Sequence, residues 1–437
     1  MNIAFYNWKT IDSETKNRIL RRAQANIDAV CETVKPIIED VKNRGDTALK
    51  DYALKFEKVQ IDTIKATSQE FEKAESALDK DIKAAIQHCV QNVKTFHQEQ
   101  MRRVEKPWMI EVEPGVWAGE QVNAIPSVGL YVPRGKGAFP SALYMLAIPA
   151  IIAGVEEIAI TTPPTPDGGI DDATLYTAKL CGVENVYKAG GAQAIAALAY
   201  GTETIPKVCK VLGPGSPYVA AAKRLLSDIM DPGMPAGPSE SIVLADETAQ
   251  SDNTILDILN EAEHGKDSGA LLVTHDKELA NYVREHMPKV IQTLPQPHRD
   301  ICAYVMGESD KSYGGIILTE SLEESVAFAN EYAPEHLHLK VKDHETILPK
   351  LKHAGEILIG EYTPSSLGNY GIGVNHVLPT GGWAKSYSCT SVWDFLKRTS
   401  ISKCNKAGFN AISDSVAKMT DYEGFPAHGE VIRRRKL

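Results

Sequence analysis

Glu335 and His336 form an acid–imidazole pair within EYAPEHLHL, residues 331–339. Before this stretch, SLEESVAFAN has apolar residues at helical spacing, and Pro334 disfavours helical backbone at the residue before it. After it, HLHLKV alternates like a strand. A carboxylate beside an imidazole supplies both halves of proton transfer near neutral pH. We therefore predict proton-transfer chemistry at a helix-to-strand junction, although such a pair, taken alone, is more often part of a loop without a chemical role.

Glu261 and His264 are three residues apart at the end of a predicted helix. One helical turn brings the carboxylate and the imidazole to the same face, which is a metal-ligand spacing. The motif is short, and a solvated helix end is the simpler alternative. Two further ligand candidates are Asn369 in LGNYGIGVNHVLPT and His428 in EGFPAHGE. One carboxylate, two imidazoles and an amide suit zinc, but the sequence does not show that the four residues meet.

The elements that must position these residues alternate between strand and helix from about residue 126 onward. Between residues 128 and 226, four apolar strands are each followed by a helix, which is typical of a parallel sheet covered on both faces. A second alternation of similar size runs from about residue 240 to 359, after the linker GMPAGPSES. We expect residues 1–125 to be mostly amphipathic helices, and the chain beyond about residue 390 to be helical again.

Glycine-rich loops follow the strands of the first unit: PRGKGAFPS, AGGAQA and GPGSP. Ligands of such sheets bind at the carboxyl ends of the strands. Glycine lets the backbone approach a pyrophosphate, and helix N-termini favour anions. The chain has neither a Gly-x-Gly-x-x-Gly after a strand nor a Walker loop. These glycines are therefore compatible with a nucleotide site and equally with tight turns.

The composition is that of an ordinary globular protein of two or three domains, with 437 residues, 24% of them charged and 43% hydrophobic. The net charge of −10 argues against nucleic-acid or membrane-surface partners. Ala138–Val155 carries no charge, but Pro140, Pro149 and Gly154 interrupt it, so we expect a buried helix rather than a membrane span. The absence of a signal-like N-terminus and the seven scattered cysteines predict reduced thiols and a cytoplasmic location.

Taken together, these segments resemble the histidinol dehydrogenase family over nearly the whole chain. The matching stretches are VGLYVPRGKGAFPSALYMLAIPA, GGAQAIAALAYGT, GPGSPYV, MPAGPSES, EAEHG, YAPEHL, GNYGIGVNHVLPT, SVWDFLKR and EGFPAHGE. The resemblance implies an NAD- and zinc-dependent homodimer. Such an enzyme oxidises the primary alcohol of L-histidinol to the aldehyde and then to histidine, in two hydride transfers.

The resemblance also implies an α/β fold with two Rossmann-like parallel-sheet units, helical extensions at both ends and an intertwined dimer. We predict that residues 1–27 form an N-terminal helical arm. Residues 28–130 and 239–390 form the first α/β domain, with the zinc and catalytic residues. Residues 131–238 form the second α/β domain, on the NAD side, and residues 391–437 form a C-terminal helical arm that completes the partner's site.

Individual roles follow from the matching motifs. His336 corresponds to the general base that takes the alcohol proton, and Glu335 to the group that activates water in the second oxidation. One zinc ion per subunit is held at positions 261, 264, 369 and 428, with His428 coming from the partner subunit. The residues that would line the substrate pocket are Ser239, His376 and Glu423, together with His336 and the four zinc ligands Glu261, His264, Asn369 and His428. The positions that touch NAD are Tyr131, Gln193 and Ser216.

Three positions depart from the usual family residues. Glu261 stands where the family has glutamine, Asn369 where it has aspartate, and Ser216 where it has asparagine. The first two changes together leave the formal charge around zinc unchanged, but an amide at position 369 loses a charge-assisted contact with the substrate amine. Arg134 and Lys136 add positive charge beside the cofactor region. Histidinol is the expected substrate, and the alternative is another small polar alcohol such as dihydroxypropanesulfonate.

Two further classes of protein are compatible with the motifs. One is a zinc hydrolase, in which the metal or Glu335 activates water. The other is a binding protein that has lost catalysis. The paired units with glycine-rich loops argue against the hydrolase, and the intact Glu335 and His336 argue against the loss of catalysis.

Overall fold

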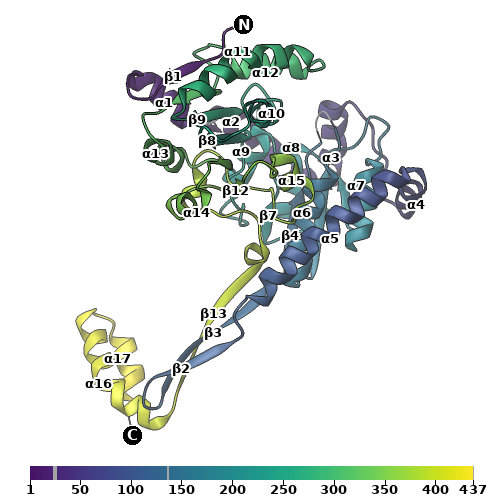
Figure 1. The fold of residues 1–437 in the computed structure, drawn as a ribbon. Coiled ribbons are helices and arrows are strands. Elements are labelled where there is room, and N and C mark those ends of the chain that lie inside the picture. The colour runs from purple at the N-terminus through teal and green to yellow at the C-terminus, as the bar shows by residue number, and fades with distance from the viewer. Residues whose placement is uncertain (23–26, 135–136, 437) are drawn as a thin grey trace.

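The computed structural model describes residues 1–22, 27–134 and 137–436. Within these residues the strands form a six-stranded, a four-stranded and a three-stranded sheet. Figure 1 shows a body that holds the two larger sheets, and an arm that projects from it and carries the C-terminus. In this part of the chain, no helix has the length and apolar character needed to cross a bilayer.

The six-stranded sheet is parallel, in the order β1-β10-β9-β8-β11-β12. Its strands are β1 (Phe5–Asn7), β8 (Glu240–Ala245), β9 (Gly269–Thr274), β10 (Gly315–Leu318), β11 (His336–Lys340) and β12 (Glu356–Ile359). The register sets His336 between Ser241 of β8 and Glu356 of β12. These three residues therefore share the amino-terminal edge of the sheet.

Helices cover both faces of this sheet, because successive side chains of a strand point to opposite faces. Val243 packs into one hydrophobic cluster, and Ile242 and Leu244 pack into the other. The first cluster includes helices α10 (Ser251–Ala262), α11 (Lys277–Thr293) and α12 (His298–Met306). The second includes α1 (Ser13–Arg21), α13 (Leu322–Tyr332) and α14 (His344–Ile347).

The four-stranded sheet is also parallel and has the order β6-β5-β4-β7. Its strands are β4 (Ser127–Tyr131), β5 (Glu157–Thr162), β6 (Val186–Lys188) and β7 (Lys210–Leu212). One hydrophobic cluster joins it to α4 (Ser68–Ala77), α5 (Lys80–Arg102), α6 (Pro140–Ala153) and α7 (Asp172–Cys181). Another joins it to α2 (Ile27–Arg44), α3 (Asp46–Tyr52), the π-helix η1 (Ala53–Glu57), α8 (Gly191–Tyr200) and α9 (Pro217–Leu225). Most of α6 is buried, which confirms that this uncharged segment is a core helix.

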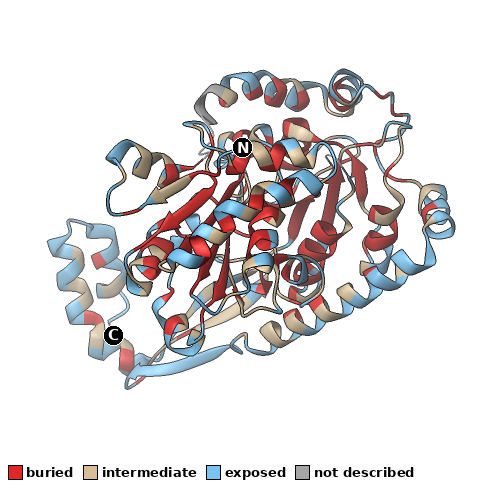
Figure 2. Cartoon of the chain, turned by 45° about the horizontal axis from the view of Figure 1, so that its top comes forward, coloured by how far each residue is buried: buried red, intermediate tan, exposed pale blue. Residues whose placement is uncertain are grey.

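The arm consists of an antiparallel sheet and two terminal helices. Its elements are β2 (Trp108–Glu113), β3 (Val116–Ala124), β13 (Leu396–Cys404), α16 (Lys406–Tyr422) and α17 (Pro426–Arg433). Strand β3 lies between β2 and β13. Every residue of β2 is exposed, and the arm is largely pale blue in Figure 2. The remaining short elements are η2 (Leu348–Lys350), α15 (Ser365–Tyr370), η3 (Trp383–Lys385) and η4 (Val392–Phe395).

The predicted mixed α/β fold with parallel sheets is confirmed, but several segments differ from expectation. The N-terminal segment contributes β1 to the six-stranded sheet, where it pairs with β10, so residues 1–27 are not purely a helical arm. The hairpin β2–β3 interrupts the predicted helical segment, and β13 opens the predicted helical C-terminus. Helices α2 and α3 share a hydrophobic cluster with α8 and α9, whereas we had grouped residues 28–130 with residues 239–390. The two parallel sheets also differ in size, with six and four strands.

Candidate active site

The Glu335–His336 pair lies at the amino-terminal edge of the six-stranded sheet. Helix α13 ends at Tyr332, and strand β11 begins at His336, which confirms the predicted helix-to-strand junction. Between them Ala333 has a φ of 52°, a left-handed conformation that is unfavourable for a residue with a side chain. This conformation turns the chain sharply, so that Pro334 and Glu335 lead directly into the strand.

His336 is buried between two carboxylates. Its Nδ1 lies 2.9 Å from Glu356 Oε2 and donates to it, and its Nε2 lies 3.9 Å from Glu335 Oε1. The hydrogen bond at Nδ1 fixes the ring orientation and leaves Nε2 for proton exchange. Burial acts to lower the pKa of His336, but the hydrogen bond to Glu356 and the charges of Glu335 and Glu261 raise it to about 9. Carboxylates therefore make this imidazole a strong proton acceptor.

Glu335 is buried next to this imidazole. Its Oε2 accepts a hydrogen bond of 3.1 Å from the backbone N–H of Glu240, the first residue of β8. Burial raises the pKa of Glu335 well above its ordinary value; the charge of His336 opposes this, whereas the charges of Glu261 and Glu240 add to it. The charges of Glu261 and Glu240 thus act together with burial to favour the protonated form of Glu335.

Two candidate ligand oxygens point to a cation site beside this pair. Glu261 Oε1 and Asn369 Oδ1 are buried without a hydrogen-bond partner. Such orphaned oxygens are costly unless something binds them, and carboxylate and amide oxygens are metal donors. His264 is exposed just beyond the end of α10, which leaves its imidazole accessible. The residues present therefore fit a zinc ion in chemical type.

His376 joins these ligand candidates to the acid–imidazole pair. Its Nδ1 donates to the carbonyl oxygen of Asn369 at 2.5 Å. Burial lowers the pKa of His376 to about 3, and the nearby charges of His336 and His264 contribute to the shift. The imidazole is thus neutral at pH 7, with Nε2 available to accept a hydrogen bond. Direct contacts join positions 335, 336 and 356, and positions 369 and 376, while the charges of Glu261 and His264 act on His336 and His376, respectively.

Two predicted pocket residues, Glu423 and His428, lie away from this cluster in the single chain. Glu423 follows α16 and His428 lies in α17, and both are exposed on the arm (Figure 1). Within the described residues of one chain, no group of three His, Cys, Asp or Glu side chains is placed to hold a metal.

The predicted NAD residues occupy the opposite kind of edge, the carboxyl ends of the four-stranded sheet. Tyr131 ends β4, and its hydroxyl accepts a 3.1 Å hydrogen bond from the backbone N–H of Gly191. Gln193 is buried in the first turn of α8, and Ser216 is the exposed N-cap of α9. Arg134 Nη1 donates to the carbonyl of Pro164 at 3.3 Å. Lys136 lies outside the described residues.

One glycine shows why such loops need glycine. Gly213 follows β7 with a φ of 123°, and a Cβ there would lie 2.0 Å from the carbonyl oxygen of Tyr131. Any side chain at this position would collide with the neighbouring strand end. The glycine of GPGSP is thus required by close backbone packing between β7 and β4.

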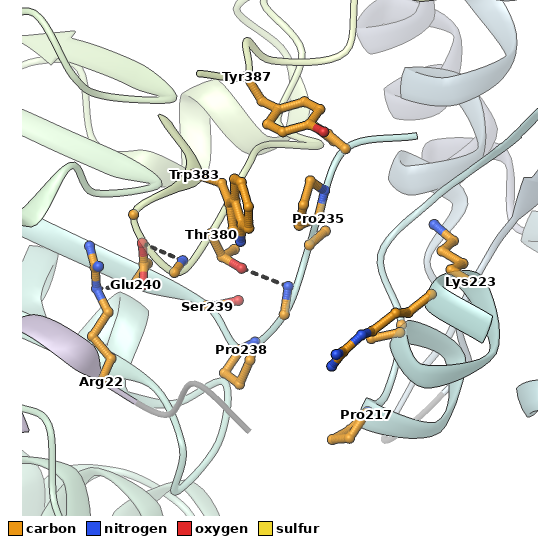
Figure 3. Close-up of a pocket in the computed structure, with 18 of the residues that line it drawn as sticks. Arg22, Pro217, Lys223, Pro235, Pro238, Ser239, Glu240, Thr380, Trp383 and Tyr387 are labelled. Carbon is orange, nitrogen blue, oxygen red and sulfur yellow. Dashed lines mark hydrogen bonds and ion pairs between the residues drawn. The ribbon is translucent and has the colours of Figure 1, made fainter. Parts of the chain in front are cut away.

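A cavity of about 910 Å³ is lined by the loop after β7 and the start of α9, and by the first residues of β8 and β9. Figure 3 shows Lys223 of α9 on one side of it and Glu240 with Arg22 on the other. Its lining includes Ser216 and Ser239, so a predicted cofactor residue and a predicted substrate residue face the same space. Gly237 donates to Thr380 Oγ1 at 2.6 Å, which ties the linker between the two units to the segment between α15 and η3. The lining reaches Glu240, whose backbone N–H binds Glu335.

Three residues of the cluster were not predicted from the sequence: Glu356, Glu240 and Arg22. Glu356 and Glu240 are each the first residue of an otherwise apolar strand. An acidic residue opening a buried strand is a signal that could have marked them. Arg22 carries no such signal, because its partners are more than 200 residues away in sequence.

Comparison with known proteins gives a consistent result over the whole chain. A model of the family described as histidinol dehydrogenase matches residues 20–436. A histidinol dehydrogenase from Synechocystis is 48% identical, over 96% of this chain and 96% of its own length. A Colwellia psychrerythraea protein named histidinol dehydrogenase homolog is 45% identical, over 98% and 96%. The crystal structure of histidinol dehydrogenase from Elizabethkingia anophelis superposes with a TM-score of 0.90 at 37% identity, covering 99% of this chain and 98% of that one.

Proposed function

Because this chain belongs to the histidinol dehydrogenase family, we propose that it oxidises L-histidinol through the aldehyde to L-histidine, with zinc and two molecules of NAD⁺. The observation that carries the proposal is the buried set of His336, Glu335 and Glu356 beside the orphaned oxygens of Glu261 and Asn369. This set combines a proton acceptor, a second acid–base group and donors for a cation.

His336 takes the hydroxyl proton of the alcohol in the first oxidation. Glu356 holds the imidazole through Nδ1, so Nε2 faces the reacting atoms. The raised pKa of His336 comes in part from the charge of Glu261. A cation bound at Glu261 opposes that charge, which favours the neutral imidazole that can accept a proton.

The absent groups supply chemistry that side chains cannot. Glu261, His264, Asn369 and the partner subunit's His428 would hold zinc, which would supply a Lewis acid for the substrate oxygen. Tyr131, Gln193 and Ser216 would hold NAD⁺, which would supply the hydride acceptor of each oxidation. Family membership supports both groups, and the donor types present support the zinc.

Glu335 serves the second oxidation by taking a proton from water as its oxygen adds to the aldehyde carbon. The resulting hydrate loses a hydride to the second NAD⁺, and a carboxylate is formed. A carboxylate whose pKa is raised by burial is a better base than an exposed one. The backbone N–H of Glu240 holds one oxygen and leaves the other near His336.

A second candidate keeps the chemistry and changes the alcohol. The exchange of carboxylate and amide between positions 261 and 369 places Asn369 where the family aspartate faces the substrate amine. A substrate without an amine, such as dihydroxypropanesulfonate, does not need that carboxylate. Several relatives at 42–45% identity carry the name histidinol dehydrogenase homolog, which is compatible with changed substrates in this family.

We also propose that the active site is completed in a homodimer by exchange of the arm. Within one chain, Trp108, Ile110 and Val112 of β2 are exposed, as is Phe425 near His428. Apolar side chains gathered on a projecting arm favour burial against a partner. A two-fold axis then delivers His428 and Glu423 from each chain to the other's site.

The decisive experiment supplies the purified protein with NAD⁺ and either L-histidinol or dihydroxypropanesulfonate. Histidinol oxidation should yield two NADH for each histidine formed, and growth of a histidine auxotroph that lacks its own enzyme should be restored. Turnover of the sulfonate alone would replace histidinol by the second candidate. Ester or amide hydrolysis without NAD⁺ would indicate the hydrolase, and the absence of any turnover with zinc and NAD⁺ present would indicate a non-catalytic protein.

A further inference from the structure

Arg22 forms a buried junction between the N-terminal segment and the catalytic turn. It follows helix α1, and its side chain is 4% exposed. Its Nε lies 2.7 Å from Glu240 Oε2, and its Nη2 donates to the carbonyl oxygens of Tyr332 and Ala333. The guanidinium also lies 3.4 Å from the centre of the Tyr332 ring. The Arg22 side chain thus contacts Glu240, Tyr332 and Ala333, which surround the turn that leads into Glu335.

Glu240 connects this junction to Glu335 directly. Its carboxylate is 3% exposed and binds Arg22 through Oε2 and the backbone N–H of Gly381 through Oε1, the latter at 3.1 Å. Its backbone N–H donates the hydrogen bond to Glu335 Oε2. The same residue therefore receives the arginine with its side chain and holds the catalytic carboxylate with its main chain.

Stability alone is a poor explanation for this arrangement. A buried ion pair seldom stabilises a protein more than well-packed apolar residues do, because both charges lose their hydration. The left-handed backbone of Ala333 also needs outside contacts to persist. Arginine suits this position, because its planar fork binds a carboxylate and carbonyl oxygens simultaneously and lysine cannot do so.

His336 does not depend on Arg22 in the same way. It has its own anchor in Glu356 and is part of the ladder of β11. The hydrogen bond given to the Glu335 carboxylate comes instead from Glu240. Disturbing the junction should therefore affect Glu335 more than His336.

We propose that Arg22 is a positioning residue for the second oxidation, holding Glu335 in place through Glu240 and through the carbonyls of Tyr332 and Ala333. This rests on the proposed division of labour between Glu335 and His336. It predicts that the alcohol and aldehyde steps respond differently to a change at Arg22, whose contacts with Glu240, Tyr332 and Ala333 hold the turn before Glu335.

The test compares Arg22→Met, Arg22→Lys and the double variant Arg22→Met/Glu240→Gln. Arg22→Met should slow aldehyde oxidation by ~10–100-fold, the usual loss when an outer-shell partner is removed, with alcohol oxidation reduced less than about fivefold. Arg22→Lys should recover only part of the loss. The double variant leaves no unpaired buried charge, so it should resist urea better than Arg22→Met while aldehyde oxidation stays slow.

The matched control is Lys340→Met, which breaks a buried ion pair with Asp257 at the opposite end of β11. It should lower stability and leave the ratio of aldehyde to alcohol rates unchanged. Equal losses of both rates in the Arg22 variants, or recovery of the aldehyde rate together with stability in the double variant, would overturn the proposal.

A readout without turnover separates this proposal from the proposed function. Crystal structures of the wild-type protein and the double variant should show Glu335 withdrawn from the Glu240 amide in the variant, with His336 still bound to Glu356. An unmoved Glu335 rejects the positioning role even in an active enzyme. A displaced Glu335 supports it even if histidinol proves to be the wrong alcohol.

Discussion

The candidate residues lie at opposite edges of the two parallel sheets, and the two edges differ in chemistry. At the amino-terminal edge of the six-stranded sheet, Glu240, His336 and Glu356 open three neighbouring strands. At the carboxyl edge of the four-stranded sheet, the candidate residues Tyr131, Gln193 and Ser216 are uncharged, and the first two are buried. The first edge concentrates titrating groups, whereas the second offers backbone amides, a phenol and an amide side chain.

This difference indicates that the edge of the six-stranded sheet carries the reaction and the edge of the four-stranded sheet binds the cofactor. Ligands of parallel sheets usually bind at the carboxyl ends of strands, and the four-stranded sheet conforms to that rule. The six-stranded sheet departs from it, because its reactive side chains sit where strands begin. Residues fixed in a strand ladder are held more rigidly than residues in loops, which suits proton transfer over short distances. The predictions below test whether one edge reacts and the other binds.

The largest effect is expected at His336. His336→Asn should slow alcohol oxidation by ~10²–10⁴-fold, the typical loss of a general base. Glu335→Gln should leave that step largely intact and slow the aldehyde step. Because a base must be ionised and the pKa of Glu335 is raised, wild-type aldehyde oxidation should increase with pH through that raised value. Rates measured separately with alcohol and aldehyde check this. Identical losses of both rates in the two variants would show that His336 and Glu335 do not have separate roles.

The metal ligands should give the next largest effect. His264→Ala should lose zinc and activity together, with a loss of affinity exceeding the ~10–100-fold seen when only an outer-shell partner is removed. The measurement is zinc content of protein purified without chelators, alongside turnover. Full activity of wild-type protein in EDTA would show that the orphaned oxygens of Glu261 and Asn369 serve another purpose.

If the arm of one chain completes the site of its partner, mixing two inactive variants should restore part of the activity. His336→Asn and His428→Ala chains are dissociated, mixed and reassociated. Random pairing makes about half of the dimers mixed, and each mixed dimer has one intact site, so roughly a quarter of wild-type activity should return. The control is each variant carried through the same treatment alone. If verified mixed dimers stay inactive, each chain builds its site without its partner.

A change at the binding edge should be milder. Tyr131→Phe removes the acceptor of the Gly191 N–H, and an unpaired buried amide costs ~1–3 kcal/mol. We expect a several-fold rise in KM for NAD⁺ with kcat nearly unchanged, measured by initial rates at saturating alcohol. A fall in kcat comparable to that of His336→Asn would contradict the separation of the two edges.

The smallest effect on catalysis is expected from a change at Lys223. This residue should instead affect how the stability of the protein depends on pH. Its Nζ donates to the carbonyl of Gly213 at 2.6 Å. Burial lowers the pKa of Lys223 to about 8 from 10.5. The folded protein thus binds fewer protons than the unfolded chain between these values, so stability should rise as pH increases from about 8 to 10.5, by at most ~3 kcal/mol. Urea unfolding across this range should show the slope, and Lys223→Met should lack it.

Much of the fold was predictable, because the buried strands and their helices have strong patterns. All four strands between residues 128 and 212 and their following helices appear as expected. The strands of the arm were missed for a physical reason. Strand β13 is mostly exposed and rich in polar residues, and β2 is exposed along its whole length. Their apolar side chains have no inner face within one chain, so the usual alternation of buried and exposed positions gives no signal.

The motifs of the candidate site were predictable from the sequence, but the contacts between its residues were not. Glu335, His336 and Glu261 stand out by residue type and spacing. Glu356 becomes a partner of His336 only through the pairing of β11 with β12, and sequence does not specify that register. Local spacing reveals even less about the contacts of Arg22, because Arg22 and Tyr332 are 310 residues apart in sequence.

The insertion of β1 beside β10 has a consequence for the order in which the protein folds. The four-stranded sheet uses strands between residues 127 and 212 and closes while later residues are still being synthesised. Strand β1, by contrast, pairs with β10 in the second half of the chain, and Arg22 contacts Tyr332, which lies 310 residues later in the sequence. Closing such long loops is slow. We therefore predict that the binding edge forms early on the ribosome and that the reactive edge is assembled only when nearly all of the chain has emerged.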